Sequence, residues 1–264
     1  MSATVPATKL SGATLRPTPA PAATALRLDI EVVMLLLSAA VGIVILASLA
    51  AAWGRLDLGI AREDVSQALD QLSKVTKFLI KFDMGSEQTV AAWLSSVLML
   101  LCGLLLLYIG GDKRLRGGAY TFHWLLLGVI FVGLSADESV AMHELVNKMA
   151  RSYFDAGGIF FYAWIIPGMA FVGLVGITYL GFLSHLENVD RVRFILAGGV
   201  FVGGAVGLEM VEGVLADWYA EAGWPMEIAV HIEETMEFAG LLLFLYALLD
   251  HARRHCRTLT LALN

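Results

Sequence analysis

The sequence predicts an all-α integral membrane protein built as a bundle of about six transmembrane helices. Hydrophobic residues make up 58% of its 264 residues and charged residues only 16%, whereas soluble domains carry about 25% charged residues. Apolar runs of about 20 residues recur along the chain, which is the length that a helix needs to cross a bilayer. Lys and Arg gather in short segments between these runs, as they do in the cytoplasmic loops of membrane proteins.

The elements follow in order along the chain. Residues 1–28 are rich in Ala, Thr and Pro and predict a disordered cytoplasmic tail, because they cannot bury enough apolar surface to offset the entropy of ordering. Residues 29–252 are expected to form a six-helix transmembrane domain, and residues 253–264 a basic cytoplasmic tail. The predicted spans are the apolar runs 32–53, 90–109, 119–136, 157–184, 194–216 and 226–249, the last two interrupted by carboxylates.

Basic residues set the expected orientation. They follow the second, fourth and sixth runs, as Lys113, Arg114, Arg116, Arg191, Arg193, Arg253, Arg254 and Arg257. The positive-inside rule puts these segments and both termini in the cytoplasm. The connection 54–89 is then external. Within it, the segment 61–82 carries apolar residues three to four positions apart, the pattern of an amphipathic helix on the membrane or over the bundle.

The charge balance and the cysteines exclude several classes of function. The net charge of -6, from 18 basic and 24 acidic residues, provides no positive field for a nucleic acid. The sequence has no glycine-rich phosphate loop after a strand and no Cys-x-x-Cys-His haem motif. Cys102 and Cys256 are too isolated to indicate a disulfide framework or a thiolate metal site.

Ionisable side chains within or beside the predicted spans are the candidates for function. Each one at membrane depth costs about 2.5 to 3.5 kcal/mol on insertion scales, so its presence points to a role. Such residues end the third run, occupy the later half of the fifth and begin the sixth: Asp137, Glu138, His143, Glu144, Glu209, Glu212, His231, Glu233, Glu234 and Glu237. With the orientation above, all of them are expected at the outer face or in the outer leaflet.

Helical geometry predicts which of these side chains face the same neighbour. At 100° per residue, His231 and Glu234 share one stripe of the last helix, while Glu233 points roughly the other way. If the third helix continued without a break, Asp137 and His143 would lie on different faces. The sequence therefore favours His231 and Glu234 as members of a site over Glu233.

A transition-metal site is the sharpest hypothesis for this set. So many carboxylates cannot all be ionised in one low-dielectric space, so they must be protonated, paired or bound to a cation. Two imidazoles with carboxylates suit zinc, iron or manganese, and copper less well. The expected ligands are His143, His231, Glu234, Glu138, Glu209 and Glu212. A bound metal would activate water for hydrolysis of a lipid or lipid-linked substrate at the periplasmic surface, although the sequence leaves open whether the protein is an enzyme.

Two other functions remain open. In a proton- or cation-coupled transporter, the carboxylates would relay charge. In a non-catalytic accessory or assembly subunit, the small-residue face formed by Gly199, Gly203 and Gly207 would contact a second copy or another membrane protein. In all three cases the surrounding partner is membrane lipid.

Two stretches of the chain resemble a family of uncharacterised bacterial multi-pass membrane proteins. Their motifs are Glu87-x5-Trp93-x-Ser95-Ser96 and Leu134-Ser135-x-Asp137-Glu138-x4-His143-Glu144. The resemblance covers residues 82–249, implies a location in the bacterial inner membrane, and carries no known activity. It adds Glu87 and Trp93 to the outer-face candidates, which also include Asp137, Glu144 and Glu237.

Overall fold

The structure is a computed structural model of the chain and describes residues 29–62, 64–151, 157–219 and 223–257. All regular secondary structure in these residues is helical, so the predicted all-α fold is confirmed. The predicted disordered tail, residues 1–28, lies outside the described residues, as does the end of the chain.

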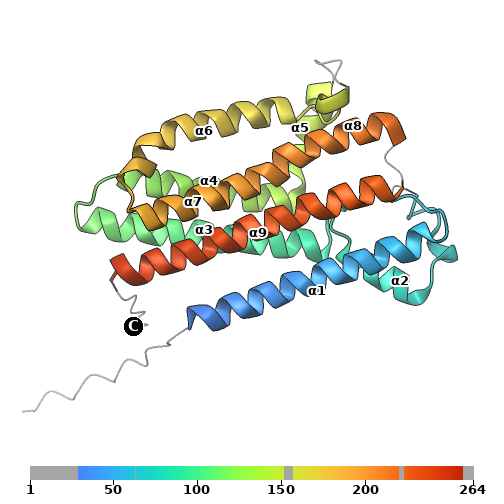
Figure 1. Ribbon diagram of the computed structural model, residues 1–264, viewed down its shortest axis with the longest axis horizontal. Helices are drawn as coiled ribbons and strands as arrows, with labels where there is room; N and C mark the ends of the chain where they lie inside the picture. The colour runs from blue at the N-terminus through green and yellow to red at the C-terminus, as the bar shows by residue number, and fades with distance from the viewer. Residues whose placement is uncertain (1–28, 63, 152–156, 220–222, 258–264) are drawn as a thin grey trace, which may run out of the picture. The chain divides into compact units, whose positions relative to one another are not determined.

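Nine α-helices form the described part of the chain (Figure 1). They are α1 (Ile30–Leu56), α2 (Lys74–Leu79), α3 (Val90–Leu115), α4 (Thr121–Val140), α5 (Met142–Arg151), α6 (Ile165–His185), α7 (Asn188–Val202), α8 (Glu209–Tyr219) and α9 (Trp224–His255). A π-helical segment, η4 (Gly203–Leu208), joins α7 to α8 without a loop. Short 3₁₀ turns lie at Leu69–Gln71, Ile80–Phe82 and Gly158–Phe160.

Five of the described helices are long and apolar enough to cross a membrane. They are α1, α3, α4, α6 and the continuous unit of α7, η4 and α8. The sixth predicted span corresponds to α9, whose 32 residues exceed the roughly 20 that a span requires. Because it carries several carboxylates, α9 is not among the described helices that are apolar enough to cross a membrane, so five of the six predicted spans meet this criterion.

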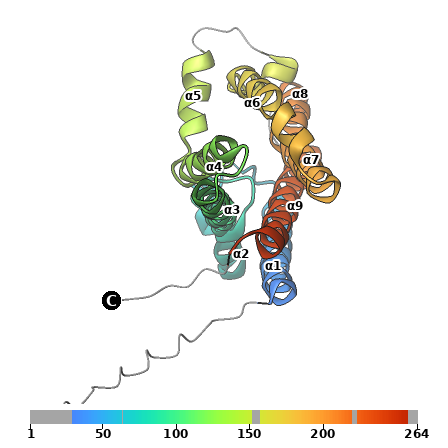
Figure 2. The ribbon, with the colours of Figure 1, turned by 90° about the vertical axis from the view of Figure 1, so that its left-hand side faces the viewer.

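Within the bundle, α9 contacts α1, α3, α7 and α8 (Figure 1). The helices α3 and α4 pair extensively as a hairpin and lie side by side in the end-on view (Figure 2). The buried core between these helices is formed mainly by large apolar side chains, among them Leu98, Leu106, Ile109, Trp124, Phe182, Phe238, Leu241 and Leu248. By contrast, α6 packs lightly against α7 and η4, and its Tyr179 and Phe182 contact His123 and Trp124 of α4.

The segment 61–82 does not form the single amphipathic helix that its apolar spacing predicts. It is divided into turns, the helix α2 and two 3₁₀ turns. Ser73 separates the residues before it from α2. Its side chain caps the start of α2 by accepting a hydrogen bond of 3.0 Å from the backbone N–H of Thr76. Leu72 is buried with Ile60 and Ala68 in a small separate cluster. Local capping and packing therefore override the helical period.

Close approach of α9 to η4 and α7 depends on glycines other than the predicted face. A Cβ atom on Gly204 would lie 2.9 Å from the backbone oxygen of Glu233, and one on Gly240 would lie 2.7 Å from Phe201. A Cβ on Gly199 or Gly207 would meet nothing within 4 Å. Of the predicted glycine face, only Gly203 has a neighbour at this range, the end of the Met236 side chain at 3.2 Å.

The predicted basic segments gather at one end of the bundle, where α3 and α9 end and α7 begins; we call this the basic end. Arg116 on the turn after α3 donates to the backbone oxygen of His255 at 2.8 Å. Arg193 of α7 donates to Asp250 of α9 at 2.6 Å. Because α9 continues to His255, the first residues of the predicted basic tail are helical. The opposite end, where α1 and α4 end and α9 begins, is called the carboxylate end.

Candidate functional site

A break between α4 and α5 positions His143. Ala141 adopts a left-handed conformation with φ 53°, which stops α4 and redirects the chain. The imidazole then lies 3.2 Å from Asp137 through Nδ1 and 3.3 Å from Glu87 through Nε2. The hydrogen bonds to Asp137 and Glu87 raise the pKa of His143 to about 10, so the ring is a cation at neutral pH. An unbroken helix would have put Asp137 and His143 on different faces.

The π-helical segment η4 brings two glutamates to the same region. A π-helix inserts an extra residue into the turn, and such segments are frequent at functional sites. Glu209 and Glu212 follow it directly, in the first turn of α8. Glu209 accepts a hydrogen bond of 2.6 Å from the indole N–H of Trp164, which fixes the carboxyl group against the start of α6.

Six glutamates from three helices interact with one another at the carboxylate end. We call this set the carboxylate cluster; its members are Glu138 of α4, Glu209 and Glu212 of α8, and Glu233, Glu234 and Glu237 of α9. Glu233, which helical geometry had turned away from the site, interacts with both Glu209 and Glu212. Five members keep partly exposed side chains, while Glu212 is buried.

Negative charge exceeds positive charge in this region. Among the side chains that the structure describes, the cations that interact with the cluster are His143 and Arg62, the latter in the connection after α1. Glu212 is 5% exposed, and its Oε1 has no hydrogen-bond partner among the described residues. Because several carboxylates cannot all remain charged at this spacing, the cluster must hold protons or a cation.

A buried ion-pair network supports the cluster from the side of α1. Glu227 of α9 pairs with Arg55 at 2.7 Å and with Arg62 at 2.8 Å. Arg62 also pairs with Asp83 at 3.3 Å, and Gly85 leaves the space for its guanidinium. The carboxylates of Asp83 and Glu227 raise the pKa of Arg62, although burial acts in the opposite direction. The sequence analysis did not select these residues as site candidates, because a charged residue at the end of an apolar run is typical of the end of a membrane span.

His231 lies apart from the carboxylate cluster. Its Nε2 is 2.9 Å from the hydroxyl of Ser48 on α1, and its Nδ1 is 2.7 Å from the backbone oxygen of Glu227. Both ring nitrogens therefore have partners: Nε2 joins α9 to α1, and Nδ1 bonds within α9. The two imidazoles of the predicted metal site, His143 and His231, have separate partners, so the structure does not bring the predicted ligand set together as a whole.

The remaining outer-face candidates are placed as follows. Asp137 and Glu87 flank His143, and Glu237 belongs to the carboxylate cluster. Trp93 is 65% exposed on α3, so it faces the surroundings of the bundle. Of Glu144, only the backbone in α5 belongs to the described part of the chain.

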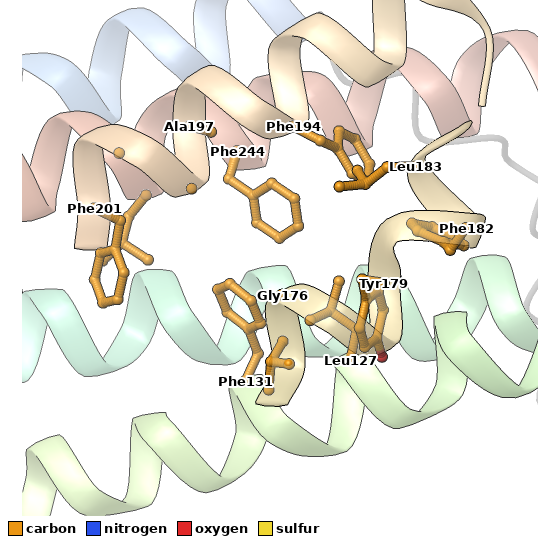
Figure 3. Close-up of a pocket in the computed structure, with 14 residues that line it drawn as sticks. Leu127, Phe131, Gly176, Tyr179, Phe182, Leu183, Phe194, Ala197, Phe201 and Phe244 are labelled. Carbon is orange, nitrogen blue, oxygen red and sulfur yellow. The ribbon is translucent and has the colours of Figure 1, made fainter. Parts of the chain in front are cut away.

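An apolar pocket of about 200 Å³ opens between α4, α6, α7 and α9 (Figure 3). Phe131 and Phe244 stack across it with ring centroids 5.0 Å apart. In the wall of the pocket, the hydroxyl of Tyr179 donates a hydrogen bond of 2.8 Å to the backbone oxygen of His123. This hydroxyl proton is therefore not offered to the interior of the pocket. On α9 the pocket begins at Gly240, one turn beyond Glu237, and it extends away from the carboxylate cluster.

Comparison with known proteins identifies a family without an assigned function. The family model described as "Domain of unknown function (DUF8692)" matches residues 39–252, and the chain belongs to this family. The match begins within α1 and ends within α9, and it includes the whole carboxylate cluster. No curated protein and no solved structure matches the chain.

Proposed function

We propose that this member of the DUF8692 family is a multi-pass membrane protein that binds a divalent cation in the carboxylate cluster. The observation that carries the proposal is the buried Oε1 of Glu212, which has no partner in the described part of the chain and lies amid the five other glutamates of the cluster. A carboxylate oxygen in this position gains from a cation because charge in a low-dielectric site is costly unless neutralised.

The available donors favour a cation that prefers oxygen ligands. The pairing of His143 with Asp137 and Glu87, and of His231 with Ser48, argues against imidazole ligation. Carboxylate oxygens suit Mn²⁺, Ca²⁺ and Mg²⁺. Of the metals expected from the sequence, manganese is therefore retained in this proposal, and zinc and iron are not assigned to the cluster.

The proposed location is the bacterial inner membrane, with the basic end in the cytoplasm. The clustering of Arg116, Arg193 and Arg254 at one end supports this orientation, because basic residues favour the cytoplasmic side. The carboxylate cluster would then face the periplasm and receive its cation from there.

Hydrolysis of a lipid or lipid-linked substrate is a second candidate function, favoured by the apolar pocket. A pocket of about 200 Å³ with apolar walls suits a hydrocarbon chain. Its start at Gly240 would hold the polar end of such a molecule near Glu237. A cation in the cluster would polarise a scissile carbonyl or phosphoryl group and activate water.

The accessory-subunit alternative is supported by a different surface. The open space beside Gly199 and Gly207 would admit the backbone of another helix. Stoichiometric co-purification of a second membrane protein, lost on substitution of Gly199 by a bulky residue, would support this role.

The test is cation binding by the full chain. Protein purified in detergent and freed of metal is dialysed against Mn²⁺, and bound Mn²⁺ is measured by electron paramagnetic resonance. Glu212→Gln and Glu234→Gln, which preserve side-chain volume, should each lower the affinity by at least about tenfold, or about 1.4 kcal/mol. Asp70→Asn, at an exposed carboxylate outside the cluster, is the matched control. Absence of saturable binding, or binding that both cluster variants leave unchanged, would overturn the proposal.

A further inference from the structure

A second group of ionisable side chains lies at the basic end, apart from the carboxylate cluster. Asp190 lies in the first turn of α7, and His251 and His255 lie one turn apart at the end of α9. In the part of the chain that the structure describes, these three are the one group of His, Cys, Asp or Glu side chains whose candidate ligand atoms all lie within 4.8 Å of one another. The glutamates of the carboxylate cluster lie farther apart, so a cation bound there must draw their side chains together.

The distances and hydrogen bonds of Asp190, His251 and His255 show how their candidate ligand atoms are arranged. Asp190 Oδ2 lies 2.6 Å from His251 Nδ1 and 3.9 Å from His255 Nε2. Arg254 lies 3.0 Å from the same Nε2 of His255. Because a guanidinium can only donate hydrogen bonds, His255 Nε2 must be the acceptor. Its lone pair therefore points toward Arg254, and a metal ion can take it only when this guanidinium moves away.

Burial leaves His251 with an unused nitrogen. Asp190 and His251 are 1% and 4% exposed, and His251 Nε2 has no hydrogen-bond partner in the described part of the chain. An unsatisfied buried polar atom is unfavourable. Because Asp190 Oδ2 lies on Nδ1, an ion that binds both residues replaces the proton between them, and the unpartnered Nε2 takes up that proton as the ring changes tautomer.

We propose that Asp190, His251 and His255 form a site for a divalent transition metal, with zinc as the preferred ion. Two imidazoles and a carboxylate from a second helix form a donor set typical of zinc. Glu187 Oε2, which lies 3.6 Å from His255 Nε2, supplies a fourth ligand. The bound metal clamps the start of α7 to the end of α9, independently of the cation in the carboxylate cluster.

Arg254 competes with the metal for this position. Its guanidinium contacts Asp190 and lies 3.0 Å from Glu187 Oε2, so it supplies the positive charge that the metal would bring. It also lies 3.1 Å from Asp250 and is 29% exposed. It can therefore turn toward Asp250 and the solvent when the metal binds. Repulsion between the two cations makes metal affinity sensitive to the charge at position 254.

The test uses the metal-free full chain in detergent. Co²⁺ serves as a spectroscopic probe, and Zn²⁺ affinity is measured by competition with a chromophoric chelator. Wild-type protein should develop the visible absorption of tetrahedral Co²⁺, which one equivalent of Zn²⁺ removes. His255→Gln and His251→Gln each remove a proposed ligand and should lower Zn²⁺ affinity by at least about 10- to 100-fold, the loss that removal of an outer partner of a metal ligand already causes.

Further variants distinguish metal binding at this site from a loss of folding and from binding elsewhere on the chain. Arg254→Met should raise Zn²⁺ affinity, a result that loss of folding cannot mimic. His185→Gln, at the end of α6 on the same side of the bundle, should leave it unchanged, as should Glu212→Gln in the carboxylate cluster. The proposal is wrong if wild type gives no tetrahedral Co²⁺ spectrum, or if Arg254→Met lowers the affinity. It is equally wrong if His255→Gln binds Zn²⁺ as wild type does.

Discussion

The imidazole of His143 lies 3.2 Å from the carboxylate of Asp137, although the two residues are only six positions apart in a chain that is helical on both sides of Ala141. A continuous helix would separate them by more than a turn and a half. The left-handed conformation of Ala141 turns α5 away from the axis of α4 (Figure 2) and creates the contact. This short break therefore supplies one of the cations that balance the carboxylate cluster.

Stability should depend on pH through His143. Hydrogen bonds to Asp137 and Glu87 raise its folded-state pKa to about 10, above the unfolded value of about 6.5. The stabilisation is therefore complete below about pH 6.5 and is lost as the pH rises toward 10. We expect the melting temperature of wild type in detergent to exceed that of His143→Gln at pH 6, with a difference that shrinks by pH 10. A difference that is constant between these pH values would contradict the assignment.

Glu227 should be essential to the stability of the bundle. It is 4% exposed and pairs with both Arg55 and Arg62. Glu227→Ala leaves the buried guanidinium of Arg55 without its counter-charge, which should cost about 3 to 5 kcal/mol. Asp70→Ala, at an exposed carboxylate in the same connection as Arg62, should stay within about 0.5 kcal/mol of wild type. Unfolding by denaturant in mixed micelles measures both values.

Substitution by alanine should change the stability of the fold in opposite directions at two pairs of glycines. Gly204→Ala and Gly240→Ala place a methyl group within 3 Å of backbone atoms of a neighbouring helix, so each should destabilise the fold by about 1 to 3 kcal/mol. Gly199→Ala and Gly207→Ala meet open space and gain helix propensity, so they should be neutral or stabilising by up to about 1 kcal/mol. Thermal unfolding compares the four variants directly. Equal losses at both pairs would show that Gly199 and Gly207 are in contact with another protein.

Cysteine labelling tests the proposed orientation. In a Cys256→Ser background the remaining Cys102 is buried, so an introduced cysteine reports alone. Asp57→Cys at the carboxylate end should react with a membrane-impermeant maleimide added to intact cells. Arg114→Cys at the basic end should react only after the cells are permeabilised. Rapid labelling at position 114 from outside would reverse the proposed topology.

The sequence by itself determined the class of fold and the regions of charge. Apolar runs and basic clusters are local properties, because a span must be continuous in the chain and its flanking charges lie next to it. The predicted runs correspond to α1, α3, α4, α6, the α7 to α8 unit and α9. The same reasoning found the glutamates of the carboxylate cluster, since charge inside an apolar run is visible without a structure.

Only the tertiary structure decided which charged groups meet. Ser48 and His231 are 183 positions apart, and no local pattern indicates that this histidine packs against α1 instead of joining the glutamates. Asp190 and His251 are 61 positions apart and come together because α7 and α9 pack along each other. The left-handed residue at Ala141 and the π-helix before Glu209 each change the direction of the side chains that follow. Helical periodicity holds only while the helix is regular, so these two local departures determine which of the predicted residues share a site.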